Sequence, residues 1–152
     1  MTTSKQIFTE AQRALLTLVL NRIIPAEDRF PGAGDLGITD FVERVAGQSP
    51  GMRRLFNEGL TLMEITAMQL EGKEFQDLCS TAQDAVLREV ETRSPGFFDT
   101  LIRQCYNGYY TNPQVFQLIG YQRKLAHEYK HQPLDESLLE PQRQRQPFWR
   151  QA

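Results

Sequence analysis

The chain has 152 residues, of which 40% are hydrophobic and 24% charged, as in an ordinary soluble globular protein. This length suffices for one domain with a sizeable core and is short for two. The net charge of -2 excludes a strong overall attraction to nucleic acid or to anionic membranes. No apolar run approaches the ~20 residues of a membrane-spanning helix, so we expect no membrane insertion.

The first predicted helix begins after Thr9 and ends at Ile24. Thr9 followed three residues later by Gln12 forms a capping-box pattern, which marks a helix start. Its polar side chains form only a narrow stripe, so we expect a central helix that is buried on most sides. Pro25 disfavours helical backbone at the residue before it and therefore ends the helix.

A loop with Pro31 and three glycines follows, and we expect unusual backbone angles there. Its sequence, FPGAGDLG, superficially resembles a glycine-rich nucleotide loop. It follows a helix rather than a strand, however, and so lacks the context that nucleotide binding requires. Thr39 or Asp40 should open a short helix that Gly47 ends.

Three later helices are predicted to begin at Ser49-Pro50, Ser94-Pro95 and Asn112-Pro113, because each pair combines a capping residue with proline at the first helical position. The first of them should stop at Gly72 and the last, a short one, at Gly120.

A further helix is expected between them, from a second capping-box pattern at Ser80 and Gln83 to about Glu91. Cys79 and Cys105 either form one bridge or are two buried thiols, and we favour the thiols. Residues at helical spacing are predicted to fill the core, and those of the long helix are Met52, Leu55, Phe56, Leu60, Leu62, Met63, Ala67 and Leu70.

The sequence therefore predicts an all-α protein: one compact domain of about five to six helices over residues 1–121, then an extended polar tail over residues 122–152. The tail has three prolines, is rich in Gln and Arg, and holds apolar residues too sparsely to form its own core. We interpret it as a segment that docks on a surface.

The tail also contains the only two histidines, in the stretch HEYKH. His127 and His131 with Glu128 between them match the zinc-ligand and general-base pattern of metalloproteases, which makes a stand-alone zinc hydrolase one alternative. A zinc site needs a third protein ligand, and no third histidine exists. Pro133 also cuts any helix short, so we favour a solvated, charged turn.

A second alternative is a helical binding module that contacts nucleic acid through QRQRQPFWR. Three arginines and an aromatic pair could contact phosphates and bases. The rest of the domain is acidic, however, so we expect no nucleic-acid partner.

Two stretches, TLVLNRIIPAEDRFPGAGDLGITDFVERV (residues 17–45) and FFDTLIRQCYNGYYTNPQVFQLIGY (residues 97–121), carry a family resemblance. They contain an apolar helix ending in I-I-P, then P-G-A, and later G-Y-Y, an N-P turn and G-Y. In this order they resemble the gluconate 2-dehydrogenase subunit 3 family. The tail is also similar to the end of glycoside 3-dehydrogenase small subunits.

The resemblance implies a non-catalytic, all-helical small subunit that binds no cofactor itself. Its implied partner is a large oxidoreductase of the glucose–methanol–choline type, which holds FAD and oxidises a sugar or sugar acid. Some complexes of this kind add a cytochrome c subunit. Many relatives begin with a twin-arginine signal peptide, which this sequence does not show. We therefore expect a cytoplasmic location, or a periplasmic one if the chain is processed or exported with its partner.

A subunit of this kind should bind through aromatic and arginine side chains. The predicted interface residues are Tyr109, Tyr110, Phe116, Tyr121, Phe148, Trp149 and Arg150. For the first four, packing within the last helices is an equally good interpretation. The glycine-rich loop is predicted to be structural rather than a contact with the flavin.

Overall fold

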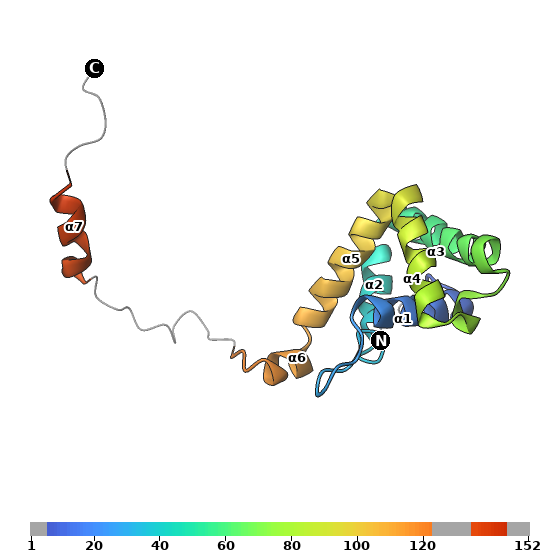
Figure 1. The fold of residues 1–152 in the computed structure, drawn as a ribbon, viewed down its shortest axis with the longest axis horizontal. Coiled ribbons are helices and arrows are strands. Elements are labelled where there is room, and N and C mark those ends of the chain that lie inside the picture. Colours follow the sequence, from blue (N-terminus) through green and yellow to red (C-terminus); the bar gives the residue numbers. More distant parts are fainter. Residues whose placement is uncertain (1–5, 123–134, 146–152) are drawn as a thin grey trace, which may run out of the picture. The chain divides into compact units, whose positions relative to one another are not determined.

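The computed structural model describes residues 6–122 and 135–145. The chain divides into two units, Met1–Tyr121 and Gln122–Ala152. The first contains α1 (Glu10–Ile23), α2 (Ile38–Ala46), α3 (Pro50–Glu71), the 3-10 turn η1 (Phe75–Asp77), α4 (Ser80–Arg93), α5 (Pro95–Tyr110) and α6 (Pro113–Leu118) (Figure 1). No β-strand forms within the described ranges, and the predicted all-α fold is confirmed.

The start of α1 confirms the predicted capping box. Thr9 Oγ1 accepts a hydrogen bond from the Gln12 amide at 3.1 Å, and Gln12 Oε1 accepts one from the Thr9 amide at 2.9 Å. The helix ends where Ile24 adopts extended backbone before Pro25. It contacts α2, α3, α4, α5 and η1, so it is the central helix of the domain. One side of its first half stays open, however, because Ala11 and Ala14 are exposed.

The predicted start of α2 was wrong by one to two residues. The helix begins at Ile38, and its N-terminal cap is Gly37, whose φ of 71° lies in the left-handed region that glycine tolerates. Thr39 cannot act as the cap because it is buried and its hydroxyl lies 2.7 Å from the Thr17 hydroxyl. Asp40 instead forms an ion pair with Arg13, which lies on α1.

The second predicted capping box, at Ser80 and Gln83, does not form. Cys79 occupies the cap position of α4 and makes no side-chain bond there. The side-chain Nε2 of Gln83 donates instead to the carbonyl of Phe75 at 3.1 Å, which fastens α4 to η1. A tertiary contact has therefore taken the side chain that the local pattern assigned to capping.

The other helix ends follow the sequence pattern closely. Ser49 Oγ accepts from the Met52 amide at 3.1 Å, and Asn112 Oδ1 from the Gln114 amide at 2.9 Å. α5 begins at Pro95 as predicted, although Ser94 makes no side-chain cap. Glycine in the left-handed region terminates α3, with a φ of 63° at Gly72.

The core lies where α3 packs alongside α4 and α2 packs on α5, with α1 between them (Figure 1). Three aromatic rings form its centre. The rings of Phe8 and Phe56 are 6.3 Å apart, and those of Phe56 and Phe97 are 5.7 Å apart and nearly perpendicular. Gly59 of α3 is buried against the Phe97 ring, and an added Cβ would overlap that ring.

The prediction that Leu70 lies in the core was wrong. Phe56, Leu60, Met63 and Ala67 are fully buried, whereas Leu70 is 50% exposed. The thiol prediction was correct in part. Neither cysteine is bridged, but only Cys105 is buried, and Cys79 is exposed.

The described part of the second unit contains a 3-10 turn, η3 (Glu136–Leu139), followed by a short helix, α7 (Glu140–Arg143). The sequence had not predicted these turns. Asp135 begins them by accepting a hydrogen bond from the backbone amide of Ser137 at 3.0 Å. Hydrogen bonding to the Ser137 side chain and, to a lesser degree, to this amide lowers the pKa of the Asp135 carboxyl. None of the helices in the described ranges combines the length and apolarity that a bilayer crossing needs.

Candidate partner-binding surface

The glycine-rich loop between α1 and α2 is held by one side chain, that of Asn21. Its Oδ1 accepts hydrogen bonds from the amides of Gly34 at 2.8 Å and Asp35 at 3.3 Å, and its Nδ2 donates to the Asp35 carboxylate at 3.0 Å. The Ala33 amide donates to the carbonyl of Ile24 at 3.0 Å. The amides of Ala33, Gly34 and Asp35 are therefore already used within the fold and are not free to bind a phosphate.

Two of the three loop glycines are required for close packing rather than for backbone angle. A Cβ at Gly32 would overlap the Asn21 side chain, and one at Gly34 would overlap both Asn21 and the backbone carbonyl of Thr17. Of the three, only Gly37 has a positive φ, and Asp28 earlier in the loop also lies in the left-handed region with a φ of 49°. The prediction of unusual backbone angles thus holds at one glycine and at one aspartate, and the loop has a structural role.

Tyr109 joins this loop to α5. It is 3% exposed, and its hydroxyl donates to the carbonyl of Pro31 at 2.9 Å. Burial raises the pKa of the Tyr109 hydroxyl, and the neighbouring Tyr110 and Cys105 add to this effect. A residue so enclosed packs the domain together, so of the two interpretations given for Tyr109 the geometry favours internal packing.

Next to Tyr109, three large side chains face outward: two tyrosines near the end of α5 and an isoleucine directly after α6. Tyr106 is 44% exposed, Tyr110 is 49% exposed and Ile119 is 48% exposed. The rings of Tyr106 and Tyr110 stack with 6.0 Å between centroids and an interplanar angle of 4°. These three residues, with Tyr109, Phe30 and the end of α1, line a groove of about 320 Å³. We call Tyr106, Tyr110 and Ile119 the tyrosine surface.

Phe116 and Tyr121 form a separate pair at the end of α6. Gly120, with a φ of 69°, reverses the chain. As a result, the amide of Tyr121 donates to the carbonyl of Phe116 at 2.8 Å, and the amide of Gly120 donates to the carbonyl of Gln117 at 3.2 Å. This is the Schellman motif, which commonly brings two apolar side chains into contact. The two rings lie 4.9 Å apart accordingly. Tyr121 remains 53% exposed, so its other side is available to a partner.

The predicted interface residues are thus divided by the structure. Tyr110 and Tyr121 are exposed, Phe116 is partly buried and Tyr109 is buried. Phe148, Trp149 and Arg150 lie outside the described residues, as do His127, Glu128 and His131 of the HEYKH stretch. Among the residues that are described, no group of three or more His, Cys, Asp and Glu side chains is placed to hold a metal ion.

Tyr106 and Ile119 are exposed residues that the sequence analysis did not assign to the interface. The signal for Tyr106 was its spacing of four from Tyr110 on one helix, which places both on the same face. The buried residues Leu101 and Cys105 share the neighbouring face.

The described fold is a small helical domain whose polar loop atoms are satisfied internally and whose outward feature is a set of exposed aromatic side chains. The family model for gluconate 2-dehydrogenase subunit 3 matches residues 10–124, and the chain belongs to this family. The family is that of a subunit of a dehydrogenase complex. Neither the curated proteins nor the solved structures contain a significant match.

Proposed function

We propose that this chain is the non-catalytic small subunit of a sugar or glycoside dehydrogenase, and that it binds and stabilises a large FAD-dependent subunit of the glucose–methanol–choline type. FAD would belong to that partner and not to this chain. The observation that carries the proposal is family membership over residues 10–124, and the exposed tyrosine surface supports it.

The tyrosine surface has the properties of an interface centre. Tyrosine is enriched in interfaces because it contributes a large apolar area at low entropic cost and retains a polar hydroxyl. The stacked Tyr106 and Tyr110 are already ordered by each other, so little rotamer freedom remains to be lost on binding. The adjoining groove, about 320 Å³, could receive one apolar side chain of the partner.

The experiment is co-expression of this chain with a large flavoprotein dehydrogenase subunit of the glucose–methanol–choline type from the same organism. We expect the pair to purify as one complex and the partner to be more soluble and more fully loaded with flavin than when it is expressed alone. A partner that is equally soluble, flavin-loaded and active alone, and that does not co-purify with the chain, contradicts the proposal.

Variants then locate the interface. Tyr106→Ser with Tyr110→Ser should weaken binding of the partner by tenfold or more, since central aromatic residues commonly contribute ~2 kcal/mol or more. Leu70→Ser is the matched control, because Leu70 is as exposed as Tyr110 but lies on α3 and lines neither the tyrosine groove nor any other described groove. It should leave the affinity unchanged.

A further inference from the structure

A second groove lies along α1 from Ala11 to Leu18, in a place that the proposed partner surface does not use. It has a volume of about 480 Å³ and is formed by α1, the second half of α3 and η1. Ile23, which lines the tyrosine groove, lies ~7.5 Å further along α1 than Leu18, and the two grooves share no lining residue. The two grooves are therefore distinct surfaces of one domain.

The groove exists because small residues occupy α1 at this point, and the residues at its bottom are apolar. Ala11 and Ala14 are exposed, and below them Leu15 and Phe75 are 7% and 2% exposed. Met68 on the α3 side is 55% exposed, which is the highest value among the large hydrophobic residues of α3. A central helix that leaves this strip uncovered, beside an exposed methionine, presents an apolar surface for a further segment.

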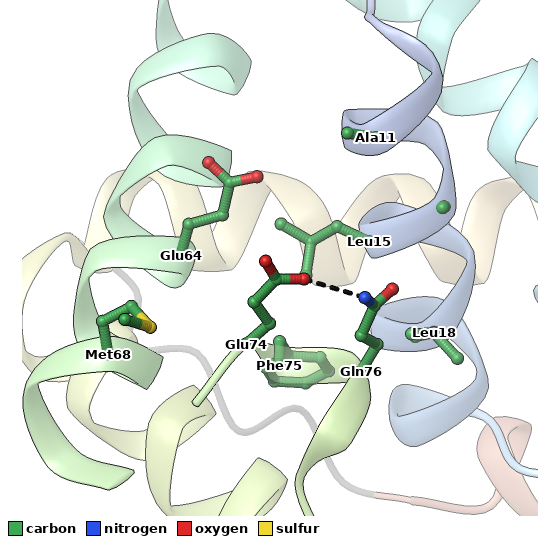
Figure 2. Close-up of a pocket in the computed structure, with 9 residues that line it drawn as sticks. Ala11, Leu15, Leu18, Glu64, Met68, Glu74, Phe75 and Gln76 are labelled. Carbon is green, nitrogen blue, oxygen red and sulfur yellow. Dashed lines mark hydrogen bonds between the residues drawn. The ribbon is translucent and has the colours of Figure 1, made fainter. Parts of the chain in front are cut away.

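Two carboxylates stand over this apolar floor. Figure 2 shows Glu74 between the α3 side chains Glu64 and Met68 on one side and the α1 side chains on the other. The side-chain amide of Gln76 donates a hydrogen bond to the Glu74 carboxylate at 2.8 Å, which holds this carboxylate in the groove (Figure 2).

No cation compensates these carboxylates within the described part of the chain. Neither Glu64 nor Glu74 takes part in a described ion pair, and no basic residue lines the groove. Lys73 precedes Glu74 but is exposed and does not line the groove. The occupant that complements this surface is therefore apolar where it meets the floor and cationic where it meets the two carboxylates.

From this chemistry we infer that the groove binds a segment of the dehydrogenase partner in which a bulky apolar side chain is flanked by lysine or arginine. The inference rests on the proposed function and makes it more specific, because it gives the partner a second contact on this domain. The apolar side chain would pack on Ala11, Ala14 and Met68, above the buried Leu15 and Phe75, and the basic side chain would lie between Glu64 and Glu74. An arginine suits both surfaces, since its aliphatic stem can cover apolar atoms while the guanidinium meets carboxylates.

Two sets of variants test the two halves of this chemistry on the complex of full-length chain and partner. Ala14→Phe fills the groove from an exposed position and should weaken partner binding about tenfold, the loss expected for an excluded anchor side chain. Glu64→Gln with Glu74→Gln should weaken binding a few-fold at low salt and reduce the salt dependence of the affinity, because exposed charges are screened.

The controls are Thr81→Phe, which introduces the same bulky ring, and Asp99→Asn, which neutralises one carboxylate; both residues are at exposed helical positions that line no described groove. Both should bind as the wild type does. Circular dichroism should show that Ala14→Phe remains folded, as expected for a residue whose side chain points away from the core.

The outcomes separate this inference from the proposed function. If the groove variants bind normally while the tyrosine-surface variants bind weakly, the groove inference is wrong and the proposed function stands. If the wild-type chain forms no complex with the dehydrogenase subunit, both are wrong. If the free chain self-associates and Ala14→Phe abolishes this association, the groove belongs to a second copy and the inference is overturned.

Discussion

Replacing Gly59 with alanine should destabilise the helical domain, although alanine is the better helix former. Gly59 is buried in the middle of α3, and a Cβ there would overlap three carbon atoms of the Phe97 ring. That ring cannot move aside easily, because Phe97 is 1% exposed and its edge packs against Phe56 with 5.7 Å between centroids. The substitution therefore sets helix propensity against core packing.

Two opposing contributions, helix propensity and core packing, decide whether Gly59→Ala lowers or raises the free energy of unfolding. Gly to Ala inside a helix gains about 1 kcal/mol of stability. Extra volume in a well-packed core costs about 1–3 kcal/mol, and the upper half of this range applies because the overlap falls on a buried ring rather than on a flexible side-chain tip. We expect a net loss of about 1–2 kcal/mol in the free energy of unfolding. Gly51, in the first turn of the same helix, is the matched control.

Gly51 is exposed, and the nearest atom to an added Cβ there is Ser49 Oγ at 4.0 Å. Gly51→Ala should therefore be neutral or raise the stability by about 0.5 kcal/mol. Urea unfolding followed by circular dichroism measures both variants, and the midpoint should shift without a change in slope. Equal or greater stability of Gly59→Ala relative to the wild type would refute the packing argument. Against a Phe97→Leu background the cost of Gly59→Ala should fall, since the two residues are in contact.

Two further predictions concern the loop and the thiols. Asn21→Ala should lower the free energy of unfolding by about 2–3 kcal/mol, because it leaves a buried loop amide without its acceptor; a loss under about 0.5 kcal/mol in urea unfolding would contradict this role. A thiol reagent should modify Cys79 alone in the native protein and reach Cys105 only after denaturation, since burial raises the pKa of the Cys105 thiol from 9.0 to about 12. The folded state therefore keeps this proton where the unfolded state loses it, so the stabilisation by Cys105 is complete below about pH 9 and is lost as the pH rises toward 12. Between these limits the urea midpoint should fall less steeply with pH in Cys105→Ala than in the wild type, and equal slopes would contradict the assignment.

The sequence predicted the helix ends well wherever the deciding contact is local. The caps at Thr9, Ser49 and Asn112 are made by bonds that span two or three residues, so a short pattern contains both partners. The predictions at Thr39 and at Ser80 failed because the side chains involved bind across the fold. Thr39 meets Thr17, and the glutamine expected to complete the second capping box binds a carbonyl of η1 instead. A local pattern does not contain these partners.

The candidate site was predictable in part for the same reason. The sequence showed that aromatic residues gather at the end of α5 and in α6, but which of them face outward depends on which helices cover α5. Tyr109 turns inward because a loop about 80 residues earlier in the chain supplies the carbonyl of Pro31 for its hydroxyl. The groove beside Ala14 could not be predicted either. We had expected α1 to be covered on most sides, and its open strip depends on where η1 lies.

Several of the residues that carry the family resemblance have structural roles in the described domain. The loop glycines pack on Asn21, the I-I-P ending of α1 provides the carbonyl that holds Ala33, and Tyr109 binds Pro31. Side chains committed in this way fix the architecture and are little available for contact with another protein. Recognition of a particular partner must then depend on the remaining exposed surfaces, of which the tyrosine surface is mainly apolar and the α1–α3 groove is apolar and acidic. Because both border the same helix of one domain, a partner that contacts both gains the second contact at little further cost in rotational freedom. Weakening one surface should therefore leave a complex held by the other, and the two losses of binding free energy should add.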